Sequence, residues 1–220
     1  MKGNQKVNGV IFDLDGTLID SYQAIYLSFK YAYENMGLPP LPYEVVKKVV
    51  GRGLNQTFRE LLGEEQVPRA LTLFRKKYEE VFRIHTHLLP DVPEVLETLH
   101  RRNVHMAVAT NKFGRFSRAI FEHLGMGKYF AAIVGDGDVS ENKPNPEMAY
   151  YAIGKMGVKK EDTVFVGDSV IDIQTAKNAG LRMFAVPTGN TAREDLERAL
   201  PTVLLDRLLD LLTYISQGSV

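Results

Sequence analysis

Apolar and polar positions divide the chain into short apolar runs and stretches of helical periodicity. The runs occupy residues 10–12, 104–109, 131–134, 163–166, 183–186 and 203–205, and the helical stretches lie near 92–102, 116–124, 146–156, 171–179, 194–200 and 207–215. Continuous apolar strands that alternate with helices are typical of a parallel sheet covered on both faces. We therefore predict an α/β fold, with a Rossmann-like parallel sheet flanked by helices.

One long segment breaks this alternation, because residues 20–84 contain no strand pattern. Ile25, Phe29 and Ala32 follow helical spacing there, and glycines such as Gly51 punctuate the segment into about four helices. The segment is thus a helical insertion between the first and second strands of the sheet.

We expect this insertion to form its own domain. Residues 1–19 and 85–220 would make up the α/β core, residues 20–84 the helical domain, and residues 18–20 and 83–89 the hinges between them. The tail at 217–220 is expected to be frayed.

Composition narrows the range of functions. The 220 residues carry 27 lysines and arginines against 27 aspartates and glutamates, so no net charge attracts nucleic acid or an anionic membrane. Cysteine is absent, which excludes disulfides, thiolate metal sites and a cysteine nucleophile. No apolar run reaches the roughly 20 residues of a membrane span, and the start of the chain is unlike a signal peptide. We expect a cytoplasmic protein, either monomer or homodimer.

Polar residues capable of chemistry follow the first two apolar runs. In an open α/β sheet, ligands bind beyond the carboxyl ends of the strands. Asp13 and Asp15 follow the first run, and Gly16 permits the chain to turn so that both meet one ligand. Thr110 and its two neighbours follow the second run, although threonine there would also suit a helix N-cap.

Two later strands end in the same way. Lys143 follows the third run and is held by the neighbouring Pro144, with Pro146 two residues further on, which favours a fixed positive charge. Asp168 follows the fourth, with Asp172 four residues on, where either a helix dipole or a divalent metal would explain the two carboxylates. Each signal alone is moderate, but together they predict one site at one edge of the sheet.

In this order the motifs resemble those of the haloacid dehalogenase-like phosphatases. Residues 11–20, 108–112, 143–144 and 166–180 match the four motifs of that family, and the helical insertion matches its mobile cap. Residues 109–112, 142–146 and 166–169, followed by Asp172, look most like the corresponding segments of the family's phosphoglycolate phosphatases.

The resemblance implies a role for each acid. Asp13 would attack phosphorus and form an aspartyl-phosphate, and Asp15 would protonate the leaving alkoxide and then activate water. Mg²⁺ would be held by Asp13, the backbone carbonyl of Asp15 and Asp168. Asp172 belongs to the same metal site and is expected to order its outer shell or Lys143 rather than bind directly.

The resemblance also places Lys143 among the catalytic residues, beside the metal. A carboxylate that approaches a phosphate dianion is repelled by roughly 4 kcal/mol per unit charge at about 4 Å, so positive charge is required. Thr110 and Asn111 would hold phosphate oxygens, and we assign Lys112 and Gly16 to the same substrate-binding group.

The cap is expected to select the substrate. Arg52 lies between two glycines of the insertion and would clamp a substrate carboxylate, or else be an ordinary surface arginine. Three aromatic residues, Tyr22, Phe29 and Tyr33, belong to a helical stripe that we interpret as cap packing.

The sequence therefore favours a Mg²⁺-dependent phosphatase of a small phosphorylated metabolite, with phosphoglycolate as the first candidate. A pyrophosphatase or a β-phosphoglucomutase-like phosphotransferase is the alternative. Mutase relatives usually carry histidine at the position of Ile25 and a Ser-Ala pair at Thr110-Asn111, which disfavours a mutase. A non-catalytic binding protein is disfavoured because the nucleophile Asp13 is present.

Overall fold

The computed structural model describes residues 6–215, and within them six strands form one parallel sheet. The strand order is β5-β4-β1-β6-β7-β8, so the first strand of the chain lies near the centre. The strands are β1 (Gly9–Phe12), β4 (His105–Phe113), β5 (Phe130–Asp136), β6 (Thr163–Gly167), β7 (Arg182–Ala185) and β8 (Val203–Leu204). The prediction of a parallel α/β sheet is confirmed.

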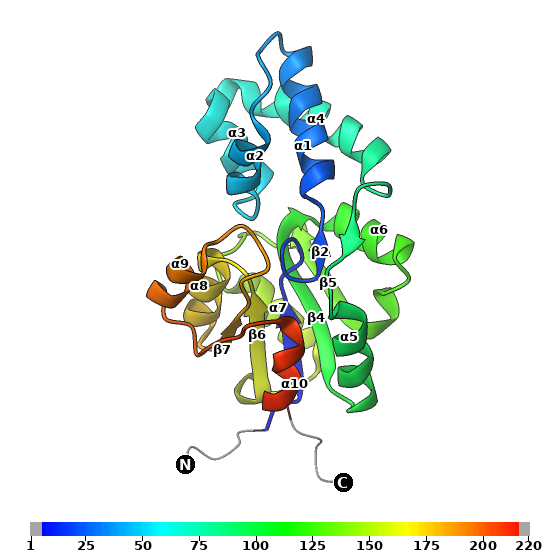
Figure 1. The fold of residues 1–220 in the computed structure, drawn as a ribbon, viewed down its shortest axis with the longest axis vertical. Helices are drawn as coiled ribbons and strands as arrows, with labels where there is room; N and C mark the ends of the chain where they lie inside the picture. The colour runs from blue at the N-terminus through cyan, green and yellow to red at the C-terminus, as the bar shows by residue number, and fades with distance from the viewer. Residues whose placement is uncertain (1–5, 216–220) are drawn as a thin grey trace.

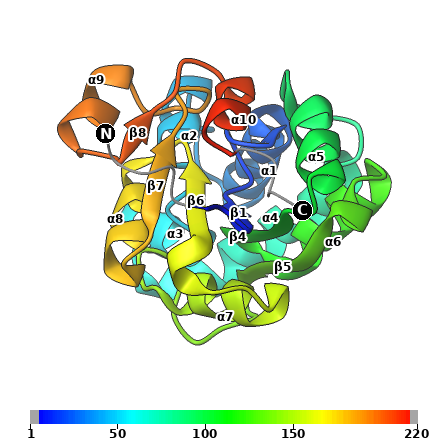
Figure 2. The same ribbon diagram turned by 90° about the horizontal axis from the view of Figure 1, so that it is seen from below.

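Helices cover both faces of this sheet, as Figure 2 shows from below. Successive residues of β1 alternate between two apolar clusters, with Val10 and Phe12 in one and Ile11 in the other. The first cluster includes residues of α5 (Val92–Arg101), α6 (Gly114–His123) and α10 (Leu211–Tyr214), and the second includes residues of α7 (Glu147–Met156), α8 (Val170–Ala179) and α9 (Arg193–Arg198). Two-sided burial is the reason that the strands are continuous apolar runs.

Four helices stand beyond the carboxyl end of the sheet (Figure 1). They are α1 (Tyr22–Asn35), α2 (Tyr43–Val49), α3 (Leu54–Leu62) and α4 (Val67–Val81), with a 3₁₀ turn at Glu64–Gln66. Their core contains an aromatic cluster in which the ring of Phe29 lies 4.8 Å from that of Phe58 and 5.3 Å from that of Phe74. The helical interpretation of this segment is confirmed.

A short two-stranded ladder lies where the chain leaves and re-enters the core. In it β2 (Ile19–Asp20) pairs antiparallel with β3 (His87–Leu88), with Ile19 opposite Leu88. Two-residue strands leave no periodicity in a sequence, so this pairing was not predicted.

The second apolar run proves to be only the first part of a longer strand. β4 continues to Phe113 instead of ending at Ala109, and its register with β5 shifts between these two residues. The polar Thr110-Asn111-Lys112 segment is therefore strand rather than a loop or helix cap.

The carboxyl-terminal part of the chain also differs from expectation. The helix predicted at 207–215 is instead a 3₁₀ turn, Leu208–Asp210, followed by the single turn of α10. The tail at 217–220 lies outside the described residues. Among the helices of residues 6–215, none combines the length and the apolar character that crossing a bilayer requires.

Candidate active site

The central strand β1 delivers the first acidic residue of the site. Asp13 follows β1 directly, its side chain is buried, and its backbone N–H donates to the Val166 carbonyl at 2.8 Å. The turn after it needs Gly16, which has φ +87°, and a Cβ at that position would collide with Asp168 Oδ2.

The neighbouring strand β6 delivers the second acid. Phe12 of β1 pairs with Val166 of β6, so Asp13 and Asp168 leave adjacent strands at the same edge. Asp172 lies in the first turn of α8, where Ser169 is the N-cap and forms a reciprocal capping box with it. Oxygen atoms of Asp13, Asp168 and Asp172 all lie within 4.8 Å of one another, and all three side chains are buried.

A buried lysine joins two of these acids. Lys143 Nζ lies 2.7 Å from Asp13 Oδ1 and 2.6 Å from Asp172 Oδ1. The other carboxylate oxygen of Asp172 accepts hydrogen bonds from the hydroxyl of Ser169 at 2.6 Å and from its N–H at 3.1 Å. Both oxygens of Asp172 thus have protein partners, which makes it an orienting partner of Lys143 in this structure.

Burial dominates the electrostatics of the cluster. It raises the pKa of Asp13 to about 7, an effect that Asp172 increases and Lys143 opposes. Burial, followed by the charges of Asp13 and Asp172, also raises the pKa of Asp168 well above its ordinary value. Burial lowers the pKa of Lys143, but its two carboxylate partners outweigh this and raise it overall. Lys143 is therefore charged, and its single ammonium does not offset the burial of three acidic side chains, as the raised pKa values of Asp13 and Asp168 show.

The geometry around Asp168 fits a small divalent cation. Thr17 Oγ1 donates to Asp168 Oδ1 at 2.7 Å and fixes the carboxylate. Its other oxygen lies in a cradle formed by Gly16 and Gly189, which a Cβ on either residue would fill. Buried hard oxygens with an excess of negative charge are the environment that Mg²⁺ prefers.

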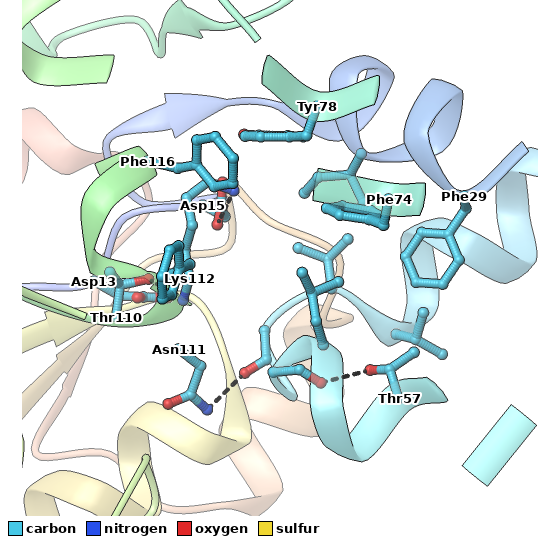
Figure 3. Close-up of a pocket in the computed structure, with 17 residues that line it drawn as sticks. Asp13, Asp15, Phe29, Thr57, Phe74, Tyr78, Thr110, Asn111, Lys112 and Phe116 are labelled. Atoms are coloured by element: carbon cyan, nitrogen blue, oxygen red, sulfur yellow. Dashed lines mark hydrogen bonds and ion pairs between the residues drawn. The ribbon is translucent and has the colours of Figure 1, made fainter. Parts of the chain in front are cut away.

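Asp15, the second acid of the first motif, has separate partners. Lys112 Nζ lies 2.9 Å from Asp15 Oδ2, and the Ser21 hydroxyl donates to Asp15 Oδ1. Lys112 Nζ also lies 5.0 Å from the ring centre of Tyr78, which comes from α4 of the helical insertion (Figure 3). Lys112, predicted to bind substrate, is thus paired with Asp15.

Asp13, Asp15 and Lys112 open into a cavity between the sheet edge and the helical insertion. Asp13, Asp15 and Thr110 line its catalytic end (Figure 3). The opposite wall is mostly apolar and includes Ile25, Phe29, Val49, Val50, Leu54 and Phe74.

Thr110 and Asn111 lie side by side but differ in their partners. The Thr110 hydroxyl faces the cavity and accepts a hydrogen bond from the Lys112 N–H at 3.1 Å. Asn111 instead bonds to the backbone of Gly51 in the insertion and to that of Lys143 in the core.

Arg52 is not gathered with the other predicted site residues. Its guanidinium lies 3.4 Å from Glu60, its side chain is half exposed, and it lines a neighbouring groove with Arg59 and Asn142. The clamp on a substrate carboxylate remains a prediction, and it would require the side chain to leave Glu60 and turn inward.

Two parts of the site were not predicted from the sequence: Tyr22 and the loop after β7. Tyr22 was interpreted as packing, yet its hydroxyl lies beside Gly16, and burial and the charge of Asp168 raise its pKa. The loop after β7 also belongs to the site, since Thr188 Oγ1 donates to the Gly16 carbonyl at 2.6 Å. The strand-end rule applies to that loop too and could have found it.

Comparison with known proteins agrees with this geometry. A family model described as haloacid dehalogenase-like hydrolase matches residues 10–186. A protein named phosphoglycolate phosphatase 1 from Pseudomonas aeruginosa is 33% identical over 219 residues, covering 96% of this chain and 80% of that protein. A phosphoglycolate phosphatase from Pectobacterium atrosepticum is 34% identical over 220 residues, covering 97% and 94%.

Solved structures give the same result. A predicted phosphoglycolate phosphatase from Haemophilus somnus superimposes with a TM-score of 0.84 at 28% identity, covering 97% of this chain and 99% of that one. The match of the family model, the two relatives and this shared architecture establish the family. The chain belongs to the haloacid dehalogenase-like hydrolases and is one of the phosphatases of that family.

Proposed function

We propose that the protein is a Mg²⁺-dependent phosphatase that hydrolyses a small phosphate monoester through an aspartyl-phosphate on Asp13. The observation that carries this proposal is the convergence of three buried side chains at one sheet edge: Lys143 Nζ lies 2.7 Å from Asp13 Oδ1, and oxygen atoms of Asp13 and Asp168 lie within 4.8 Å of each other. Residues that lie far apart in the sequence meet there with the charges that phosphoryl transfer requires.

In the first step, a carboxylate oxygen of Asp13 attacks phosphorus and the bond from phosphorus to the ester oxygen breaks. The leaving alkoxide takes a proton from the Asp15 carboxyl group. Lys112 and Ser21 hold Asp15 beside the cavity, and Asp15 Oδ2 faces Lys112 Nζ at 2.9 Å. Departure of the alcohol leaves the phosphoryl group bonded to Asp13.

In the second step, Asp15, now a carboxylate, accepts a proton from water as the water oxygen attacks phosphorus. The bond between phosphorus and the Asp13 oxygen breaks, which releases inorganic phosphate and regenerates the nucleophile. Thr110 lines the cavity, and its hydroxyl is the donor we assign to a phosphate oxygen.

Charge balance explains the need for the cation. Asp13, Asp168 and the backbone carbonyl of Asp15 would hold Mg²⁺, which neutralises the phosphate charge that the nucleophile must approach. Lys143 adds a fixed ammonium next to Asp13, and Asp172 keeps that ammonium in place.

We further propose that residues 20–84 act as a cap over the site. Tyr78 of α4 and Gly51 after α2 both line the cavity, so the insertion forms the roof of the catalytic chamber. Closure of such a roof excludes water from the first attack.

Two observations bear on the substrate. The relatives named phosphoglycolate phosphatase make phosphoglycolate the first candidate. The apolar wall opposite Asp13 favours a second class, phosphate monoesters with an uncharged apolar body, because a carboxylate against Phe29 and Phe74 would be buried without a partner.

A substrate panel with Mg²⁺ tests the proposal. It includes phosphoglycolate, p-nitrophenyl phosphate, pyrophosphate and β-glucose 1-phosphate, so that the pyrophosphatase and mutase alternatives are measured alongside. Asp13→Asn should abolish turnover with the fold intact, and a chelator should stop turnover until Mg²⁺ is restored. Full activity of Asp13→Asn, or indifference to the chelator, would contradict the mechanism.

A further inference from the structure

The side chain of Asn111 directs both of its donors and its carbonyl acceptor to backbone groups. An amide group offers two N–H donors on one nitrogen and a carbonyl acceptor. Asn111 Nδ2 donates to the Gly51 carbonyl at 2.9 Å and to the Lys143 carbonyl at 3.0 Å, and its Oδ1 accepts from the Lys143 N–H at 2.9 Å. Both side-chain donors are therefore engaged and neither is free for a phosphate oxygen.

Two of these bonds clamp the peptide groups on either side of a single residue. The N–H and the carbonyl of Lys143 both bond to Asn111, in a region where both side chains are buried. Since Lys143 Nζ contacts Asp13, the position of its backbone decides where the ammonium meets the proposed nucleophile.

The third bond reaches across to the cap. Gly51 belongs to a segment of the insertion, residues 47–51, that we call the cap turn. The same turn is held a second time, because Asn190 in the loop after β7 donates to the carbonyls of Lys47 and Val50. Two core asparagines thus hold one cap turn by its carbonyl groups, but only Asn111 also contacts Lys143 (Figure 3 shows its bond to the cap).

We propose that Asn111 is a positioning residue that ties the placement of Lys143 to docking of the cap turn, rather than a ligand of the phosphate. This inference rests on the proposed function, in which Lys143 and Asp13 act together. With the cap turn docked, three bonds fix the Asn111 amide in one plane and hold the Lys143 peptide groups. When the cap turn leaves, the amide loses one bond and is free to rotate, which loosens its hold on Lys143.

Backbone amide hydrogen exchange of the metal-free, substrate-free protein tests the geometry directly. Asn111→Ala should speed the exchange of the Lys143 N–H and of the cap-turn amides by roughly tenfold or more, because their anchoring bonds are lost. The matched control is Asn190→Ala, which removes a cap-turn contact without touching Lys143. It should speed exchange in the cap turn as Asn111→Ala does, and at the Lys143 N–H by a smaller factor than Asn111→Ala, because both Asn111 bonds to Lys143 remain.

A second variant keeps the test valid if Asn111→Ala is too unstable to study. Asn111→Asp retains the acceptor for the Lys143 N–H and loses both donors. The Lys143 N–H should therefore exchange faster than in the wild type but more slowly than in Asn111→Ala, while the cap turn exchanges as fast as in Asn111→Ala. Unchanged exchange at both places in the two Asn111 variants would overturn the proposal.

Kinetics separate positioning from phosphate binding. If Asn111 positions Lys143, Asn111→Ala should lower kcat by roughly 100-fold, as a small misplacement of a catalytic group does. The inhibition constant of inorganic phosphate should change less than threefold. A parallel rise in that constant would identify Asn111 as a phosphate ligand and refute our assignment. If the wild-type protein hydrolyses no phosphate monoester, the proposed function fails, whereas the exchange experiment still judges the contact network.

Discussion

Replacing Asp13 with asparagine should stabilise the metal-free protein above pH 7, although the same change removes the proposed nucleophile. In the fold, burial and the neighbouring Asp172 raise the pKa of Asp13 to about 7, against an ordinary value of 3.8. Between these two values the folded protein binds a proton that the unfolded chain has released. The stability linked to this proton is complete below about pH 4 and is lost as the pH rises through 7.

The magnitude follows from the same two values. The difference between 3.8 and about 7, at about 1.4 kcal/mol per pH unit, corresponds to roughly 4 kcal/mol of unfolding free energy. The neutral amide of Asp13→Asn would relieve that cost, which already includes the attraction of Lys143 at 2.7 Å from Asp13 Oδ1. We therefore expect a gain of roughly 4 kcal/mol at pH 8.5.

Urea unfolding in the presence of a chelator, from pH 5.5 to pH 8.5, measures this effect. The wild-type protein should lose stability across the range, and Asp13→Asn should show a flatter profile. Adding Mg²⁺ should stabilise the wild type more at pH 8.5 than at pH 5.5, because the ligands compete with protons at the lower pH.

Asp91 provides a control, because its pKa is shifted in the opposite direction to that of Asp13. The pKa of Asp91 is lowered by its hydrogen bond to Arg207, so Asp91→Asn should gain nothing at pH 8.5. If Asp13→Asn is less stable than the wild type at pH 8.5, or if its pH profile is as steep, then the buried acids do not carry the cost that we derive.

Two further predictions concern the rim of the site. Arg52→Ala should raise KM for phosphoglycolate much more than KM for p-nitrophenyl phosphate if Arg52 turns in to bind a carboxylate, and equal effects in steady-state assays would make it a bystander. Gly189→Ala should raise the Mg²⁺ concentration for half-maximal activity by roughly 10- to 100-fold, because the added Cβ would displace Asp168. An unchanged Mg²⁺ titration in Gly189→Ala would show that Asp168 does not bind the metal.

The sheet was predictable because burial on both faces leaves an unambiguous signal. All six apolar runs are strands of one parallel sheet. The predicted ends of the strands were wrong where polar residues continue a strand, because a polar residue in the sequence does not indicate that its position is buried. The strand from His105 to Phe113 continues through Thr110, whose side chain lines the cavity. A strand that ends in polar residues resembles a loop in the sequence.

The site was predictable to the extent that it follows from topology. Parallel strands end at one edge, so Asp13 and Asp168 had to be neighbours once β1 and β6 paired. The pairing of Lys112 with Asp15 and the inward position of Tyr22 depend on how individual side chains pack. No spacing rule contains that information, and Arg52 illustrates the same point because its partner is Glu60.

The ladder between β2 and β3 has a consequence for how this architecture diversifies. Ile19 lies opposite Leu88, so the inserted helices depart from and return to the core at almost the same place. An insertion anchored at one point makes little demand on the length or shape of what lies between its ends. The helical insertion between β2 and β3 can therefore be replaced by the insertion of another enzyme if the chain is joined at this ladder. The register of the six-stranded sheet would be unchanged by such a replacement.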